Sequence, residues 1–424
     1  MDHFNFKRGR LFAEGVDLSE VAEKVGTPFY VYSHATVTRH LQAMEAAFNG
    51  YPHVVCYALK ANSNGSLLRI LAEAGMGADI VSGGELYRAR KAGIPGRKIV
   101  YAGVGKTEAE IRDALRAGIL MFNVESTEEL REIDRVAGIM KKRAPIGLRV
   151  NPDIDAGTHP YITTGMKKYK FGMPVEEALE GYLMARKLRN VDIVGVHKHI
   201  GSQLTEITPF LESAERLVNF VKRVRAEGID LRYLDLGGGL GIRYDTESPP
   251  EPAQWLQGLI GVVRATGCTL VIEPGRSIMG NAGMLVTRVL YRKQNDLKKF
   301  IIVDAGMNDL IRPSLYNAYH RIEPVIRKKR ATITADVVGP ICESGDFLAH
   351  DRELPDVRRG ELLGVRSAGA YGFTMASNYN SRPRVAEVLV KGNRFHVVRR
   401  RETYKDLLAT ERIPAFLKPA RKRT

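Results

Sequence analysis

The chain has few cysteines and no long apolar run. Its 424 residues include three cysteines, Cys56, Cys268 and Cys342, which lie far apart in the sequence. This number and spacing exclude a disulfide framework and a cysteine metal cluster, and they are typical of a reducing compartment. The first residues, MDHFNFKRGRLF, lack the apolar core of a signal peptide, and no run is apolar enough to span a membrane. We therefore expect a cytoplasmic protein with no bound metal and no membrane partner.

Acidic residues are in the minority, and the formal net charge is +16. Such a charge is compatible with a nucleic-acid partner. However, Lys and Arg are spread along the whole chain, with short clusters only at 141–143, 327–330, 399–401 and 421–424. No zinc-finger or RNA-binding motif accompanies them. We expect a basic surface and no nucleic-acid partner, with salt-dependent retention on DNA as the test of the alternative.

From Val54 to about Ser277, short apolar runs alternate with amphipathic stretches that begin at Ser or Thr and end at Gly. This alternation predicts parallel strands connected by helices. Eight strands with seven intervening helices favour a closed (β/α)8 barrel of the TIM type over an open doubly wound sheet. The predicted strands are VVCYAL, ADIVS, KIVYAG, MFNVES, PIGLRVN, IVGVHKHI, YLDLGGG and LVIEPGRS.

After residue 277 the pattern changes to β-like runs separated by Gly and Pro. These runs are MLVTRVLYRKQ, KKFIIVDA, RATITADVVG, ELLGVRS, RVAEVLVKG and RFHVVRR. A chain of this length is also too long for one core. We therefore expect an α/β barrel domain over 29–277. A second, all-β domain of barrel or sandwich type is expected over 278–424, and the β-like start of the chain, 1–28, is expected to join it.

Polar residues gather at the predicted strand ends, where barrel enzymes place their chemistry. Each has an ordinary interpretation as a solvated lysine, a core histidine, a tight turn or a structural ion pair, but they converge on one rim. In strand order they are Lys60, Asp79, His197, His199, Gly237, Gly238, Gly239, Gly241, Glu273 and Arg276.

This set meets the needs of pyridoxal phosphate. The cofactor needs a lysine for a Schiff base and a carboxylate at its pyridine nitrogen, which Lys60 and Glu273 provide. Its phosphate needs closely approaching backbone N–H groups, which the turn Gly237–Gly239 permits. An imidazole such as His199 can stack on its ring. We therefore expect a pyridoxal phosphate enzyme.

The motifs YALKAN, DIVSGGEL, HIGSQ, GGGLGI and EPGR resemble the fold-type III pyridoxal phosphate decarboxylases. NPDIDAGTHPYITTG, RPSLY, GPICESGDFLA and SAGAYGFTMASNYNSRPR are similar to the diaminopimelate decarboxylase family specifically. The resemblance extends from about residue 10 to about residue 415. It implies loss of CO2 from the D-centre of meso-2,6-diaminopimelate to give L-lysine, the last step of lysine biosynthesis. It also implies a head-to-tail homodimer with shared active sites.

The resemblance further assigns roles to residues of this chain. Lys60 becomes the Schiff-base lysine, His199 stacks on the ring, and Cys342 supplies a proton from the second subunit. The residues implied around the cofactor are Lys60, His199, Ser202, Gly238, Gly239, Glu273, Gly275, Arg276 and Tyr371. The residues implied around the substrate are Arg276, Arg312, Tyr316, Glu343 and Tyr371.

Lys198, between two histidines, departs from the family pattern. Strand alternation predicts that it points away from His197 and His199, toward the helix layer or solvent.

Four alternatives stay open. They are a related decarboxylase acting on ornithine, arginine or carboxynorspermidine, an amino-acid racemase, a non-catalytic cofactor carrier, and the nucleic-acid binder. A substrate panel and CO2 release discriminate among the first three.

Overall fold

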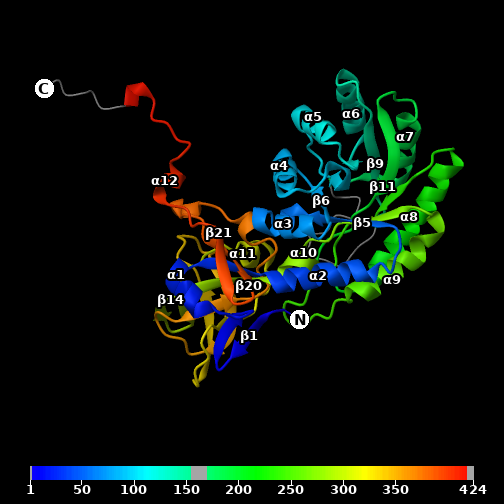
Figure 1. The fold of residues 1–424 in the computed structure, drawn as a ribbon. Coiled ribbons are helices and arrows are strands. Elements are labelled where there is room, and N and C mark those ends of the chain that lie inside the picture. Colours follow the sequence, from blue (N-terminus) through cyan, green and yellow to red (C-terminus); the bar gives the residue numbers. More distant parts are fainter. Residues whose placement is uncertain (1, 154–169, 418–424) are drawn as a thin grey trace.

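The structure is a computed structural model, and it describes residues 2–153 and 170–417. Figure 1 shows two parts, a barrel with its helices and a domain built mostly of strands. Eight parallel strands form a closed barrel. Strands that follow one another in the sequence pair side by side, including β8 (Met121–Val124) with β9 (Ala144–Asn151), and the last strand, β13 (Thr269–Ile272), pairs with the first, β5 (His53–Ala58). The closed barrel is confirmed and the open sheet is excluded.

The barrel strands coincide with the predicted ones. They are β5 (His53–Ala58), β6 (Gly77–Ile80), β7 (Ile99–Tyr101), β8 (Met121–Val124), β9 (Ala144–Asn151), β11 (Val191–His197), β12 (Tyr233–Asp235) and β13 (Thr269–Ile272). A short strand, β10 (Met173–Pro174), adds to β9.

Helices surround the barrel, and their ends follow the predicted capping residues. The Ser82 side chain accepts the N–H of Glu85 at the start of α4, and Thr107 forms a capping box with Glu110 at the start of α5. Both helices end at a left-handed glycine, Gly93 (φ 97°) and Gly118 (φ 63°). The helices are α2 (His34–Ala47), α3 (Gly65–Glu73), α4 (Gly83–Ala92), α5 (Glu108–Ala117), α6 (Thr127–Ile139), α7 (Val175–Ala185), α8 (Thr208–Ala226) and α9 (Pro252–Val263).

The second domain is a mixed sheet organised around the long strand β14, which pairs with β4, β19 and β15. The predicted β texture of this region is confirmed, although β16 and β18 were not among the predicted runs. The strands of this sheet are β4 (Phe29–Ser33), β14 (Gly283–Gln294), β15 (Lys299–Val303), β16 (Ile322–Pro324), β17 (Thr332–Val338), β18 (Phe347–Pro355), β19 (Leu362–Val365), β20 (Ala386–Lys391) and β21 (Arg394–Arg399). Short helices α10 (Arg276–Met279), α11 (Arg312–Tyr316) and α12 (Tyr404–Leu407) complete this half of the chain.

The N-terminal residues pack on this second domain. They form a small sheet of β1 (Phe4–Lys7), β2 (Arg10–Ala13) and β3 (Val16–Asp17), followed by α1 (Leu18–Val25). Leu11 and Val21 are buried in one cluster with Val31, Met284 and Val388. The start of the chain therefore shares a hydrophobic core with the strands of the β domain.

The position of β4 corrects the predicted boundary after residue 28. This strand lies in the second sheet, between β14 and β20, and not in the barrel. All five of its residues are buried, so the sequence pattern does not distinguish it from a buried barrel strand. We propose that the barrel domain begins at residue 34, where α2 begins.

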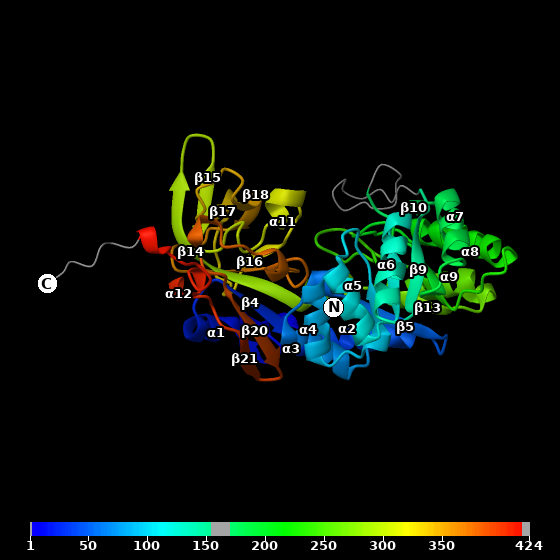
Figure 2. The ribbon, with the colours of Figure 1, turned by 90° about the horizontal axis from the view of Figure 1, so that it is seen from above.

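Figure 2 shows the two domains side by side, with α11 at the edge of the β domain that faces the barrel. Among the described residues, no helix has both the length and the apolar character needed to cross a membrane.

Candidate active site

Lys60 lies in the short 3-10 helix η1 (Leu59–Ala61), directly after β5. Since all barrel strands are parallel, their carboxyl ends meet at this rim. The Nζ atom of Lys60 is 3.0 Å from Oδ2 of the buried Asp79 on β6. Burial lowers the pKa of the Lys60 ammonium, but the negative charges of Asp79 and Glu273 outweigh burial, so that the pKa is raised. The structure thus brings Lys60 into the field of both carboxylates.

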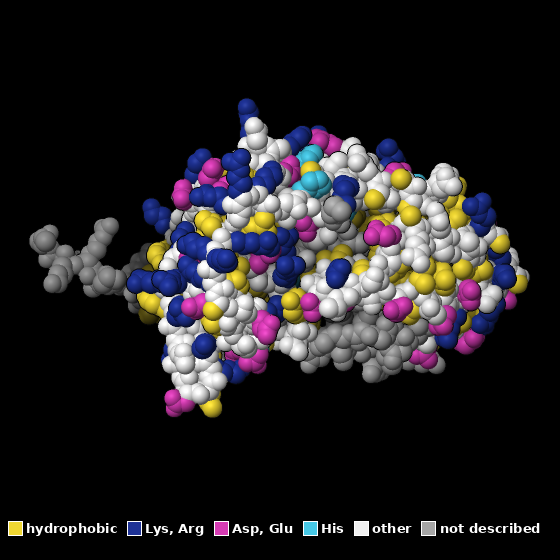
Figure 3. All heavy atoms as spheres, turned by 90° about the horizontal axis from the view of Figure 1, so that it is seen from below, with side chains coloured by type: hydrophobic (Ala, Val, Ile, Leu, Met, Phe, Trp, Pro, Cys, Tyr) yellow, Lys and Arg dark blue, Asp and Glu magenta, His cyan; other side chains and the backbone are white. Residues whose placement is uncertain are grey.

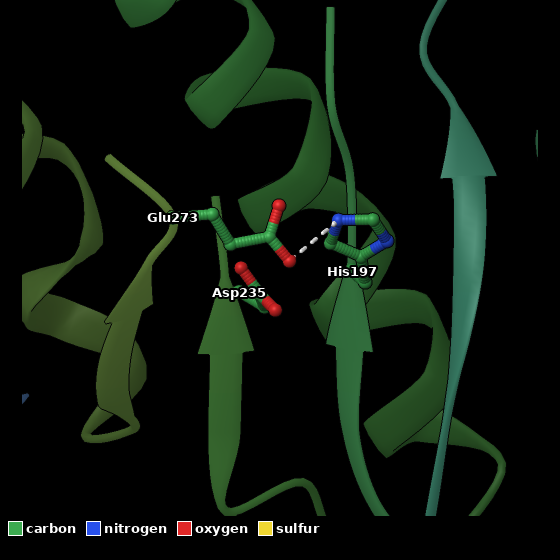
Figure 4. A group of neighbouring side chains, drawn as sticks. All are labelled: His197, Asp235 and Glu273. Atoms are coloured by element: carbon green, nitrogen blue, oxygen red, sulfur yellow. Dashed lines mark ion pairs between the residues drawn. The ribbon is translucent and has the colours of Figure 1, made fainter. Parts of the chain in front are cut away.

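Three buried side chains, His197, Asp235 and Glu273, meet where β11, β12 and β13 end (Figure 4). His197 Nε2 is 3.4 Å from Oε1 of Glu273. Asn123 on β8 donates from Nδ2 to Asp235 at 3.1 Å and to Glu273 at 3.3 Å. The strand ends therefore join four polar residues into one buried cluster, of which Asp235 and Asn123 were not predicted.

The two carboxyl groups of this cluster differ in charge. Burial raises the pKa of Glu273, but the neighbouring His197 and Lys60 outweigh burial and lower it. Burial and the nearby Glu273 raise the pKa of Asp235 well above its ordinary value. The surroundings therefore favour the ionised form of Glu273 and the protonated form of Asp235.

The glycine turn after β12 allows three strand ends to approach closely. A Cβ on Gly238 would lie 2.1 Å from the carbonyl oxygen of Glu273, and one on Gly239 would lie 2.5 Å from that of Gly201. Gly239 also has a φ of +109°, which favours glycine. The Gly238 N–H donates to Nδ1 of His199 at 3.2 Å, so the turn also orients the imidazole. Burial and the positive charge of Lys60 lower the pKa of His199, which keeps it neutral.

Residues of the β domain hold the turn that carries Lys60. The Tyr371 N–H donates to the carbonyl of Ala61 at 2.7 Å. Asn62 Nδ2 donates to the Gly369 carbonyl at 3.0 Å, and Asn64 Nδ2 donates to Oε2 of Glu387 at 2.9 Å. These three hydrogen bonds connect the Lys60 turn to the second domain and fix its position.

Two buried arginines lie where the domains meet. Arg276, on α10, donates to the Tyr244 hydroxyl at 2.6 Å and to the Ser202 hydroxyl at 3.1 Å. Arg312, on α11, has its NH1 atom 2.7 Å from Nε2 of His320. Within residues 2–153 and 170–417, neither guanidinium pairs with a carboxylate, and the Nε atom of each is buried without a hydrogen-bond partner. Since an unpaired buried charge is costly, this arrangement is suited to an anionic ligand.

Gly275, Tyr371 and Tyr316 surround these arginines. The Tyr371 ring centroid is 4.9 Å from Cζ of Arg276. A Cβ on Gly275 would lie 3.5 Å from the Tyr371 hydroxyl. Tyr316 is half-buried at the end of α11, the helix that begins at Arg312.

Cys342 and Glu343 lie apart from this rim, in the loop between β17 and β18. Both are exposed. The Cys342 N–H donates to Oδ1 of Asn380 at 2.9 Å, and the Tyr379 hydroxyl donates to Glu343 at 3.1 Å. In the described part of the chain, no hydrogen bond or ion pair connects either residue to the barrel cluster.

Lys198 points away from the histidines that flank it, as predicted, and it faces the helix layer. It is fully buried, and its Nζ donates to Oγ of Ser213 on α8 at 2.6 Å. Of the NPDIDAGTHPYITTG motif, residues 154–165 lie outside the described residues.

Four residues of the site were missed by the sequence interpretation. Asp235 is the last residue of β12, Glu273 directly follows β13, and Asn123 lies one residue before the end of β8. That strand-end position is a signal that could have identified both. Tyr244 and His320 lie in loops without any pattern, so only the folded chain shows their contacts with the arginines.

This chain is similar to known proteins over most of its length. Residues 34–280 match the family described as pyridoxal-dependent decarboxylase, pyridoxal binding domain. The chain is 54% identical over 406 residues to a diaminopimelate decarboxylase of Aquifex aeolicus, covering 95% of this chain and 96% of the relative. It is 53% identical over 411 residues to one of Pseudomonas aeruginosa, covering 97% and 99%.

This chain is also similar in fold to a solved structure. The diaminopimelate decarboxylase of M. jannaschii, in complex with L-lysine, superposes with a TM-score of 0.94 at 40% identity, covering 98% of this chain and 99% of that one. Over nearly its whole length, this chain therefore belongs to the diaminopimelate decarboxylase family of pyridoxal-dependent decarboxylases.

Proposed function

We propose that this protein decarboxylates meso-2,6-diaminopimelate at its D-centre, yielding L-lysine and CO2 as the last step of lysine biosynthesis. The observation that carries the proposal is the pair of buried arginines, Arg276 and Arg312, where the β domain meets the barrel whose rim holds Lys60 and Glu273. A substrate with two ammonium and two carboxylate groups needs such a combination of charges.

The residues present fit pyridoxal phosphate. An ionised carboxylate suits the pyridine nitrogen, and Glu273 remains ionised because His197 and Lys60 lower its pKa. A phosphate needs donors, and the buried Nε atom of Arg276 has no hydrogen-bond partner among the described residues. When bound, the cofactor supplies an electron sink for the pair of electrons that CO2 leaves behind.

The chain's own residues divide the remaining tasks. Lys60 would hold the cofactor covalently through Nζ, and the neutral His199 would stack on its ring. Glu273 would pair with the ring nitrogen. The phosphate would be surrounded by Ser202, Gly238, Gly239, Gly275, Arg276 and Tyr371.

The two ends of the substrate call for opposite charges. Arg312 and Arg276, together with Tyr316 and Tyr371, would bind the distal carboxylate, since guanidinium groups capture carboxylates in two hydrogen bonds. Glu343 would pair with the distal ammonium. The bond from the D-carbon to its carboxylate breaks and CO2 leaves. The Cys342 thiol would then donate a proton to that carbon.

We propose a homodimer for this reaction. Cys342 and Glu343 are exposed in the β domain of their own chain and make no hydrogen bond or ion pair there to the described barrel cluster. In a head-to-tail dimer these residues would enter the site of the second copy. The exposed position of the loop supports this arrangement.

The deciding experiment incubates the protein with pyridoxal phosphate and meso-diaminopimelate and measures both lysine and CO2. Equal amounts of the two products are expected. Ornithine and arginine, which lack a distal carboxylate, serve as comparison substrates and are expected to react far more slowly. Release of CO2 from ornithine or arginine in preference to diaminopimelate would contradict the proposed substrate.

A further inference from the structure

Two neutral side chains, Tyr244 and His320, contact the two buried arginines, Arg276 and Arg312. Both are buried, His320 completely. The Tyr244 hydroxyl lies 2.6 Å from NH1 of Arg276, and His320 Nε2 lies 2.7 Å from NH1 of Arg312. The two rings also pack edge to face, with centroids 5.3 Å apart at 81°. The four side chains therefore form one connected cluster, which we call the arginine clamp.

The hydrogen bonds of His320 fix its protonation. Its Nδ1 is 2.8 Å from the carbonyl oxygen of Arg366. A carbonyl only accepts, so Nδ1 carries the hydrogen; a guanidinium only donates, so Nε2 is the bare acceptor for Arg312. Burial and the positive charge of Arg312 lower the pKa of His320 to about 3. His320 is thus a neutral acceptor with one defined tautomer.

Tyr244 contacts both arginines with different parts of its side chain. The hydroxyl oxygen accepts from Arg276, while the ring face lies 4.7 Å from Cζ of Arg312. The second contact is a cation–π interaction. Burial raises the pKa of Tyr244, but Arg276 and Arg312 outweigh burial and lower it. One phenol therefore sets the positions of two like charges that would otherwise repel each other.

The neutrality of these partners has a chemical consequence. An acidic partner would orient the arginines equally well, but it would cancel the charge and compete with an incoming carboxylate. A phenol and a neutral imidazole orient each guanidinium and leave its charge uncompensated. The buried Nε atoms, which have no hydrogen-bond partner among the described residues, agree with donors kept available for a ligand.

We infer that His320 and Tyr244 are positioning residues that orient Arg312 and Arg276 toward the distal carboxylate, and thereby set the requirement for a dicarboxylate substrate. This inference rests on the proposed function, because it names what orients the same substrate site. Neither residue touches the reacting carbon, so their loss should weaken substrate binding more than the chemical step.

The test compares His320→Leu, which removes the acceptor, with His320→Gln, whose side-chain oxygen can accept from Arg312. For His320→Leu, the KM for diaminopimelate is expected to rise about tenfold to a hundredfold, the cost of a hydrogen bond to a charged group. The kcat should stay within about threefold. The KM of His320→Gln should lie close to the wild-type value. Tyr244→Phe, which keeps the ring but loses the hydroxyl, should raise the KM about tenfold.

A binding measurement makes the result independent of turnover. Titration calorimetry with pimelate, the seven-carbon dicarboxylate without amino groups, should show the same order of affinities for the cofactor-loaded wild type and variants. His53→Leu is the matched control, since it removes an imidazole whose Nδ1 lies 2.7 Å from the Tyr51 carbonyl at the opposite end of β5. That control should leave both KM and pimelate affinity unchanged.

The outcomes separate the two proposals. Lysine formation by the wild type with an unchanged KM in the folded His320→Leu and Tyr244→Phe variants would overturn the inference alone. If His320→Leu does not fold, His320→Gln and Tyr244→Phe decide the question. A raised KM for Tyr244→Phe together with a wild-type KM for His320→Gln supports the inference. A wild-type KM for both variants overturns it. A wild type that releases no lysine would contradict the proposed function, while pimelate binding would still test the clamp.

Discussion

Among single residues, Lys60 is the side chain that we propose to hold the cofactor. Its ammonium lies 3.0 Å from Asp79, and its pKa is raised by the charges of Asp79 and Glu273 despite burial. These carboxylates hold the Nζ atom at the rim of the barrel. A lysine in this place is oriented before any cofactor arrives.

Replacement of Lys60 by Ala should abolish covalent cofactor binding. We expect lysine formation to fall below about one thousandth of the wild-type rate, since no other amine replaces it. After gel filtration, the variant should lack the visible absorbance of cofactor bonded to an amine. A Lys60→Ala protein that retains that absorbance in full would show that another residue holds the cofactor.

Arg312 is the residue expected to distinguish diaminopimelate from amino acids without a distal carboxylate. Replacement by Ala should cost about 2–4 kcal/mol in kcat/KM, the range for truncating one partner of a buried charged pair. Steady-state kinetics with diaminopimelate measures this loss. The control is Arg223→Ala, which removes an exposed arginine paired with Glu176 and should leave the kinetics unchanged. Unchanged kinetics for Arg312→Ala would remove Arg312 from the substrate site.

At the scale of elements, β11 presents one lysine to the interior of the protein. Lys198 is fully buried against Ser213 of α8, and burial lowers its pKa to about 7. Ser213 also donates to the Phe210 carbonyl at 2.9 Å, so it keeps a partner if the lysine is removed. The strand and helix thus carry a buried cation that the site does not use.

Replacement of Lys198 by Met should therefore stabilise the protein at pH 7, by about 1–4 kcal/mol. Between pH 7 and 10.5 the unfolded chain binds a proton at this lysine that the folded chain does not, so wild-type stability rises with pH across this window. The gain in stability from Lys198→Met should therefore be smaller at pH 9.5 than at pH 7. Urea unfolding at pH 7 and pH 9.5 measures the difference.

The exposed Lys222 of α8 provides the control. Lys222→Met should change stability little at either pH. A Lys198→Met protein that is less stable than the wild type at pH 7 would show that the buried ammonium is stabilising.

At the scale of the whole molecule, the two domains complete one site, and a second copy of the chain is proposed to complete it further. Lys60→Ala and Cys342→Ala should each be nearly inactive alone. When they are unfolded and refolded together in equal amounts, about half of the dimers should be hybrids with one intact site, restoring about one quarter of wild-type activity. Steady-state lysine formation in the refolded mixture measures the recovery.

Refolding of each variant alone is the control for this experiment. No recovery in a mixture that contains hybrid dimers would place Cys342 in the site of its own chain or outside any site.

The net charge of +16 is distributed unevenly over the visible surface. On the face shown in Figure 3, Lys and Arg side chains are more frequent over the β domain than over the barrel, and Asp and Glu side chains lie among them. This face is therefore a mixed surface and not a continuous basic patch.

The barrel and most of its rim could be predicted from local sequence patterns. Alternating apolar and amphipathic segments with Ser, Thr and Gly at their ends specify strands and helices locally, and parallel strands necessarily bring Lys60, Asp79 and Glu273 to one edge. Lys198 could be assigned to the helix side because strand side chains alternate.

The contacts between distant loops and between the two domains depend on long-range packing, which no local pattern reveals. The strand Phe29–Ser33 has a fully buried pattern that fits either sheet, so its pairing with β14 and β20 depended on long-range contacts. The contacts of Tyr244 and His320 with the arginines follow no period or spacing, because loops have no repeating geometry that fixes where their side chains point. The local pattern therefore specified the scaffold, while packing between the domains specified the arginine clamp.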